Sequence, residues 1–181
     1  CGEIDEMITE ASWSAELLHS RYLITVDRKT ALLFSLSCEA AAALMRARTS
    51  EVRRLGAFGR HMGRAFQMMD DIFDLAHCDE TAGKKKGMDL HRRRMTLPII
   101  HAIKLFGDEH PMVQYLRGAQ ADEQQINQWV DEIRMSDAFG QAYEEARKAA
   151  LQAVQFLKAF DEGPHRQALH DIAMCIVNRG Y

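Results

Sequence analysis

Apolar residues recur at steps of three and four along the middle of this chain, and that spacing most constrains its fold. Between residues 51 and 76 the series is Leu55, Phe58, Met62, Phe66, Met69 and Phe73. Such steps place side chains on one face of an α-helix. Residues 28–45 are apolar on nearly every face, which is typical of a buried helix. We therefore expect two long helices in the first half of the chain.

The remaining segments also favour helices. An apolar stripe covers residues 3–18, and a break is expected near residues 20–27. A helix that begins at residues 96–98 has Thr96 as its expected N-cap and Pro98 in its first turn. Further helices are expected over 109–117, 122–135, 136–160 and 165–179, and a charged loop over 77–95. Because no strand-like alternation occurs, we predict an all-α helical bundle, with residues 1–181 in one domain.

Composition excludes several classes of protein. The net charge is −3, from 23 basic and 26 acidic residues, which argues against a nucleic-acid binder. No run of about 18 uncharged apolar residues occurs, so no membrane span is expected. The four cysteines form no C-x-x-C pair, and we interpret them as reduced thiols of a cytoplasmic protein. The chain begins Cys-Gly-Glu, without Met, and we expect it to be part of something longer.

Three glycines, Gly56, Gly59 and Gly63, interrupt the helix expected over 51–76. Gly59 and Gly63 lie one turn apart on the same face, and each costs about 1 kcal/mol against Ala in a helix interior. One interpretation is close packing of a second helix, which the four alanines at 40–43 would also allow. The other interpretation is clearance for a ligand.

Three carboxylates crowd one edge near the end of the same helix. Asp70 and Asp74 are one turn apart, Asp71 lies three residues before Asp74, and Gln67 lies one turn before Asp71. Like charges at these spacings destabilise a helix by a few tenths of a kcal/mol per pair. A Mg²⁺ ion reverses that repulsion, because it binds one or two carboxylates together with substrate phosphate oxygens. The alternative is a solvated acidic patch.

A basic loop follows the acidic edge. Residues 84–94 carry a net charge of +5, with Gly83 and Gly87 for flexibility. Such clusters often bind nucleic acids, but the acidic chain as a whole argues against this. The loop could instead close over a diphosphate, with Lys29 and Thr30 adding a cation and a hydroxyl. Mg²⁺ and lysines together would stabilise diphosphate as a leaving group.

Four motifs in order carry a resemblance to a known family. They are K-T-A at 29–31, G-R-A-F-Q-M-M-D-D-I-F-D at 63–74, A-G-K-K-K-G-M-D-L at 82–90 and R-M-T-L-P at 94–98. With these motifs the chain resembles the C-terminal half of the trans-isoprenyl, or polyprenyl, diphosphate synthases over essentially all 181 residues. The resemblance implies the all-α isoprenoid synthase bundle, here without its N-terminal helices, and a homodimer at full length.

The resemblance also implies a reaction. An allylic prenyl diphosphate ionises with the help of Mg²⁺. The double bond of isopentenyl diphosphate attacks the allylic cation, and proton loss gives a trans-polyprenyl diphosphate that is five carbons longer. Water would quench the cation, so the site must be dry and apolar apart from a few fixed oxygens.

Residue roles carry over position by position. By this resemblance, the residues expected to hold Mg²⁺ and the allylic diphosphate are Asp70, Asp71 and Asp74. Those in catalytic positions are Lys29, at the diphosphate, and Thr30 and Gln67, whose oxygens face the developing cation. Those in substrate-binding positions are Lys84, at the diphosphate, Phe66, in the apolar channel, and Asp89 and Arg94, in the loop.

This sequence departs from the family pattern in three places. Arg93 stands where the family usually has Gly, and Met88 where a smaller polar residue is common. The first aspartate-rich motif of the family does not occur in these 181 residues, so we expect the chain alone to be inactive. Two alternatives remain open: a non-catalytic regulatory subunit of a heteromeric prenyl synthase, and a terpene cyclase.

The eight histidines show no metal-binding pattern in the sequence. No two stand at i, i+4 beside a carboxylate or cysteine, as in a zinc site. We therefore interpret them as surface or packing residues.

Overall fold

The structure, a computed structural model, describes residues 2, 11–76 and 86–178. Every regular element in this part of the chain is helical, which confirms the all-α prediction. The elements are α2 (Ala15–Val26), the π-helical η1 (Asp27–Ala31), α3 (Leu32–Leu44), α4 (Thr49–Ala76), α5 (Met88–His91), α6 (Leu97–Phe106), α7 (Pro111–Leu116), α8 (Glu123–Met135), α9 (Asp137–Leu157) and α10 (Pro164–Val177). None of these helices is long and apolar enough to cross a membrane.

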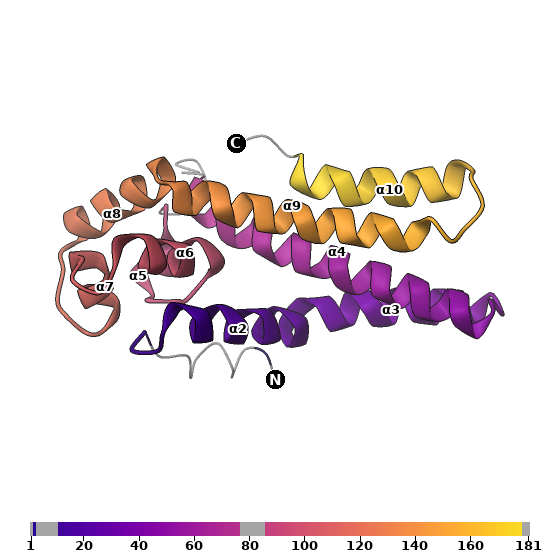
Figure 1. Ribbon diagram of the computed structural model, residues 1–181, viewed down its shortest axis with the longest axis horizontal. Coiled ribbons are helices and arrows are strands. Elements are labelled where there is room, and N and C mark those ends of the chain that lie inside the picture. The colour runs from indigo at the N-terminus through magenta and orange to yellow at the C-terminus, as the bar shows by residue number, and fades with distance from the viewer. Residues whose placement is uncertain (1, 3–10, 77–85, 179–181) are drawn as a thin grey trace.

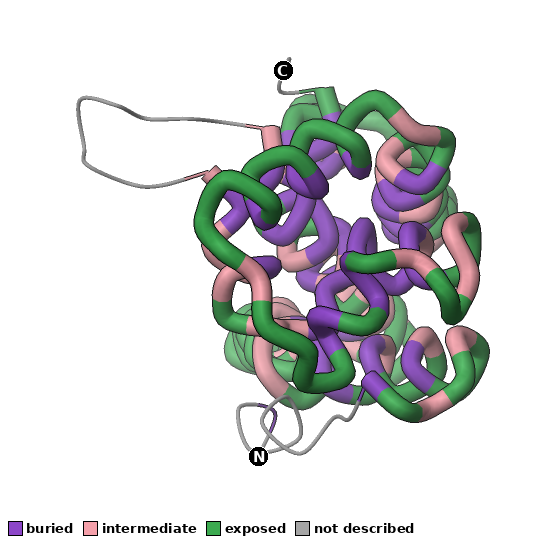
Figure 2. The backbone as a smooth tube through the Cα atoms, turned by 90° about the vertical axis from the view of Figure 1, so that its left-hand side faces the viewer, coloured by how far each residue is buried: buried purple, intermediate pink, exposed green. Residues whose placement is uncertain are grey.

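The long helices run side by side along the molecule, and the short ones gather at one end (Figure 1). Helix α4 packs against α3 on one side and against α9 on the other, and α10 covers α9. Helices α5 to α8 close the end where α4 carries its aspartates. Purple, buried segments lie inside this arrangement (Figure 2), with Leu18, Ile72, Leu75, Leu97 and Ile99 among the fully buried side chains.

The expected break at residues 20–27 is wrong. Helix α2 begins after Ser14, whose side chain accepts a hydrogen bond from the Leu17 N–H, and it continues through η1 into α3. Exposed Ser20 lies within the helix, and its hydroxyl donates to the Glu16 carbonyl oxygen at 2.9 Å. Of the stripe expected over 3–18, residues 3–10 lie outside the described part of the chain.

The expectation that 28–45 forms a buried helix is also wrong for this chain. Within α3 only Ala42 is buried, while Leu32, Leu33, Leu36 and Leu44 are exposed. Helix α3 packs on α4 through one face only, and its other apolar faces point away from the described residues. Exposed apolar patches of this kind are typical of interaction surfaces.

The glycines of α4 explain how closely α3 approaches. A Cβ atom at Gly59 would lie 2.5 Å from the Phe34 carbonyl oxygen, and one at Gly63 would lie 2.7 Å from Ala31 Cα. The packing interpretation of these glycines is therefore confirmed.

The segment expected as a loop over 77–95 contains a short helix. Helix α5 begins after Gly87, which has a left-handed φ of 69°. Four residues are too few to show a stripe in the sequence, and residues 77–85 lie outside the described part. Thr96 takes the N-cap position of α6 without a side-chain capping bond, and Pro98 lies in the first turn.

Candidate active site

The three aspartates near the end of α4 occupy different environments. Asp70 is exposed, Asp71 is only 7% exposed and Asp74 is half-buried. Phe66 lies one turn before Asp70, is 39% exposed, and packs against Phe34 with ring centroids 5.6 Å apart. An apolar ring thus lies beside the acidic edge, as the predicted substrate channel requires.

A chain of hydrogen bonds joins three elements at the buried aspartate. The Thr30 hydroxyl of η1 donates to Gln67 Oε1 at 2.7 Å, and Gln67 Nε2 donates to Asp71 Oδ1 at 3.0 Å. From α2, the Tyr22 hydroxyl donates to Asp71 Oδ2 at 2.7 Å. Lys29 lines the same small pocket as Tyr22, Gln67 and Asp71. The structure therefore brings together the predicted residues Lys29, Thr30, Gln67 and Asp71.

The π-helical segment determines where Lys29 and Thr30 lie. A π-turn inserts an extra residue into a helix and rotates the side chains that follow, and such turns are frequent at functional sites. Here η1 spans Asp27–Ala31, which includes both residues. The π-turn was not predicted, because hydrophobic spacing does not distinguish a π-turn from an α-turn. The contact of Tyr22 with Asp71 was not predicted either.

Burial raises the pKa of two of these aspartates, Asp71 and Asp74. It raises the pKa of Asp71 to about 7, against the opposing effect of the hydrogen bonds from Tyr22 and Gln67, and nearby Asp89 and Asp70 raise it further. Burial also raises the pKa of Asp74, although the backbone N–H groups of Asp89 and Met88 oppose the change. A divalent cation would favour the ionised forms, so the donor set and its electrostatics fit Mg²⁺.

The end of the basic loop is attached to the acidic edge. The Asp89 N–H donates to Asp74 Oδ2 at 2.9 Å, and the Gly87 N–H donates to the Asp74 carbonyl oxygen at 2.8 Å. Arg94 lies 3.6 Å from the Asp89 carboxylate. Asp89 and Arg94 are thus next to the aspartates, whereas Lys84 lies outside the described residues. Their roles at the substrate stay predictions.

Asp27, the first residue of η1, forms ion pairs with two arginines of α4. Asp27 accepts hydrogen bonds from Arg60 Nη2 at 2.5 Å and from Arg64 Nη2 at 2.6 Å, so both arginines of α4 hold η1. Burial would raise the pKa of Asp27, but the hydrogen bonds from Arg64 and Arg60 hold it at about 2. No local sequence pattern indicates this pairing.

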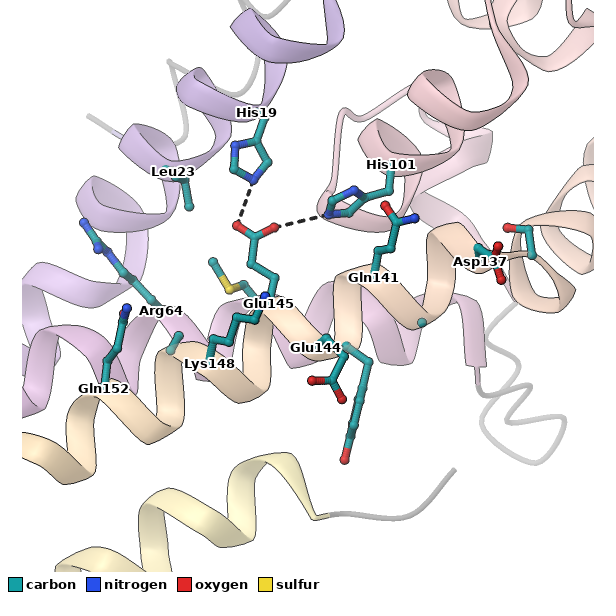
Figure 3. Close-up of a pocket in the computed structure, with 15 residues that line it drawn as sticks. His19, Leu23, Arg64, His101, Asp137, Gln141, Glu144, Glu145, Lys148 and Gln152 are labelled. Carbon is teal, nitrogen blue, oxygen red and sulfur yellow. Dashed lines mark hydrogen bonds and ion pairs between the residues drawn. The ribbon is translucent and has the colours of Figure 1, made fainter.

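A large cavity of about 950 Å³ opens between α2, α6 and α9 (Figure 3). His19 and His101 point toward Glu145 across it. His19 Nε2 lies 2.7 Å from Glu145 Oε1, and His101 Nε2 lies 3.2 Å from Glu145 Oε2. The interpretation of the histidines as surface or packing residues is therefore incomplete for these two. Their separation in the sequence left no local pattern to find.

Comparisons with known proteins identify the family of this chain. The family described as polyprenyl synthetase matches residues 1–133. The chain is 30% identical, over 99% of its length and 55% of the relative, to heptaprenyl diphosphate synthase component 2 of Geobacillus stearothermophilus. It is 31% identical, over 98% of its length and 54% of the relative, to an all-trans-nonaprenyl-diphosphate synthase of Rhodobacter capsulatus.

A solved structure shares the fold. The polyprenyl synthase of Caulobacter crescentus, complexed with calcium and isoprenyl diphosphate, superposes with a TM-score of 0.88 at 27% identity. That match covers 98% of this chain and 54% of the other. The chain thus spans about half the length of the relatives it matches. Motifs, fold and comparisons together show that it belongs to the polyprenyl synthetase family.

Proposed function

We propose that this chain provides the diphosphate-ionising half of a Mg²⁺-dependent prenyltransferase. The whole enzyme would condense an allylic prenyl diphosphate with isopentenyl diphosphate to a longer trans-polyprenyl diphosphate. One observation carries the proposal: buried Asp71, exposed Asp70 and half-buried Asp74 share one edge of α4. A buried carboxylate with no compensating cation is unfavourable, so this arrangement makes physical sense as a metal site.

Bound Mg²⁺ would neutralise the diphosphate and make it a better leaving group. The chain's own residues would then position the substrate. Gln67 cannot rotate freely, because its amide donates to Asp71 and its oxygen accepts from Thr30. Fixed oxygens of this kind stabilise a developing cation without reorganisation. Lys29 and the predicted Lys84 would contact the diphosphate.

The apolar surroundings would protect the cation from water. Phe66 lies beside Asp70, and fully buried Ile72 and Met69 lie on the same helix. Asp89 and Arg94 would hold the loop end over the diphosphate, because Asp89 is bonded to Asp74 and lies near Arg94. Excluding water strengthens every electrostatic interaction in such a site.

We infer that elongation needs a second aspartate-rich motif, which the sequence printed here does not contain. This chain alone would then elongate nothing. The exposed leucines of α3, at 32, 33, 36 and 44, are the surface against which the complementary helices would pack. Those helices could belong to the same polypeptide or to another subunit.

Two assemblies are compatible with this proposal. The family resemblance points to a homodimer, whereas the name component 2 of the Geobacillus relative points to a different partner chain. The mass of the purified native assembly, measured by native mass spectrometry, distinguishes the two. A purely regulatory subunit is less consistent with the structure, since a scaffold has no use for a buried carboxylate on an acidic edge. A terpene cyclase would consume the allylic diphosphate without isopentenyl diphosphate.

The test is incorporation of radiolabelled isopentenyl diphosphate by the protein expressed from its complete reading frame, with geranyl diphosphate as the allylic substrate. We expect product only with Mg²⁺, and a loss of about 100-fold or more in an Asp70→Asn/Asp71→Asn variant. Asp161→Asn, at an exposed position, is the control and should keep full activity. Undiminished turnover by the double variant, or turnover in chelator, would refute the proposal, as would consumption of geranyl diphosphate alone.

A further inference from the structure

Three potential metal ligands converge from three helices, on the cavity side of the molecule. They are His19 of α2, His101 of α6 and Glu145 of α9 (Figure 3). One ligand atom from each lies within 4.8 Å of the others, and this is the one such group of histidine, cysteine and acidic residues found within 11–76 and 86–178. The proposed prenyl transfer uses none of the three.

We propose that His19, His101 and Glu145 form a Zn²⁺ site. This proposal is independent of the function proposed above. Two imidazole nitrogens and one carboxylate are a ligand set that zinc uses in catalytic sites, with a fourth position left open. Nitrogen ligands favour zinc and its transition-metal neighbours, whereas magnesium prefers oxygen alone. The cluster therefore differs in kind from the aspartates of α4.

One ligand atom from each residue lies within 4.8 Å of the others, and in this arrangement the two histidines contact different oxygens of Glu145. Bonds of about 2.0–2.1 Å place neighbouring ligand atoms about 3.3 Å apart. His101 Nε2 and Glu145 Oε2 are 3.2 Å apart, and His19 Nε2 and Glu145 Oε1 are 2.7 Å apart. The two imidazole rings, with centroids 6.0 Å apart and planes at 58°, lie on either side of one carboxylate. Small side-chain rotations would bring the histidine nitrogens to a shared ion.

The site is also accessible. The side chains of His19, His101 and Glu145 are 33%, 15% and 26% exposed, respectively. All three line the 950 Å³ cavity. Zinc can therefore enter without unfolding, and water can occupy the fourth position. Because the ligands come from α2, α6 and α9, zinc would link these helices and raise the melting temperature.

Zinc binding to the complete protein tests the proposal directly. The protein is stripped with chelator, and Zn²⁺ is titrated against a chromophoric competitor in millimolar Mg²⁺. Excess Mg²⁺ competes for sites built from oxygen ligands alone, and the variants below test whether the bound zinc belongs to the histidines. We expect one equivalent of Zn²⁺ to bind and the melting temperature to rise.

Matched variants assign the ligands. His19→Gln and His101→Gln keep a group that can hydrogen-bond Glu145, and each should weaken zinc binding by more than the 10–100-fold typical of losing an outer-shell partner. His170→Gln is the control, since His170 pairs with its neighbour Asp171 on α10 and does not belong to the three-residue cluster. It should bind zinc like the unaltered protein.

X-ray absorption of the zinc-loaded, unaltered protein gives an answer that does not depend on whether a variant folds. The expected spectrum shows two imidazoles and one carboxylate around zinc. Failure to take up zinc, equal uptake by all variants, or a spectrum without two imidazoles would overturn the proposal. The cluster would then be an ordinary carboxylate–histidine hydrogen-bond network.

Discussion

Replacing Gly63 with Ala tests whether close packing of α3 on α4 holds the catalytic residues in place. The new Cβ atom would lie 2.7 Å from Ala31 Cα and 3.1 Å from Phe34 Cβ. Carbon atoms pack at about 3.5–4.0 Å, so the two helix backbones must separate by roughly 0.8 Å or more. Ala31 directly follows Thr30, whose hydroxyl lies 2.7 Å from Gln67 Oε1. Separation would therefore stretch the hydrogen-bond chain to Asp71.

The expected magnitude follows from two opposing effects. Alanine is favoured over glycine in a helix interior by about 1 kcal/mol, while overpacking a core typically costs about 1–3 kcal/mol. Because the obstacle is helix backbone rather than a movable side chain, we expect the upper part of that range. The free energy of unfolding should fall by about 1–2 kcal/mol, which lowers the urea midpoint by roughly 0.5–1 M.

Two other glycines provide matched controls. A Cβ atom at Gly56 of the same helix would meet the flexible carboxylate end of Glu39, and one at Gly140 of α9 would meet nothing within 4 Å. Urea unfolding should therefore rank the variants: Gly140→Ala stabilised, Gly56→Ala near neutral and Gly63→Ala destabilised. If Gly63→Ala were as stable as Gly140→Ala, α3 would not pack as described and the reasoning would be refuted.

Two further predictions concern buried carboxylates. The side chain of Asp27 is only 12% exposed, and its pKa is lowered to about 2. The stability that the ionised Asp27 adds to the fold is therefore fully present above about pH 4 and is lost as the pH falls toward 2. Asp27→Asn should cost about 2 kcal/mol at pH 7, with the difference vanishing in acid; a constant difference from pH 7 to pH 2 in urea titrations would count against the ion pairs. Asp71 has its pKa raised to about 7, so its native state binds the extra proton and the metal-free protein loses stability as pH rises from about 4 to 7. Asp71→Asn should therefore stabilise the metal-free protein at pH 8 by about 1–3 kcal/mol; thermal unfolding that shows destabilisation instead would contradict the burial argument.

The sequence was sufficient for features that depend on local spacing. The stripe from Leu55 to Phe73 predicted α4, which the structure shows as Thr49–Ala76. The spacing of the aspartates placed them on one edge of that helix. The pairing of Gly59 and Gly63 indicated a close helix neighbour, and the neighbour is α3.

Features that depend on partners elsewhere could not be predicted. Tyr22 and Asp71 are 49 residues apart, and His19 and Glu145 are 126 apart, so no local pattern connects them. Continuity of α2 into α3 depends on a π-turn that Arg60 and Arg64 hold through Asp27. The burial expected for α3 failed because an apolar helix is buried only if an element covers each face.

The central claim is that the acidic edge of α4 binds a magnesium–diphosphate complex. Calorimetric titration of the protein with inorganic pyrophosphate, with and without Mg²⁺, measures this without requiring turnover. We predict heat of binding only when Mg²⁺ is present, lost in Asp70→Asn/Asp71→Asn and retained in Asp161→Asn. Equal pyrophosphate affinity without the metal, or unchanged affinity in the double variant, would contradict the claim.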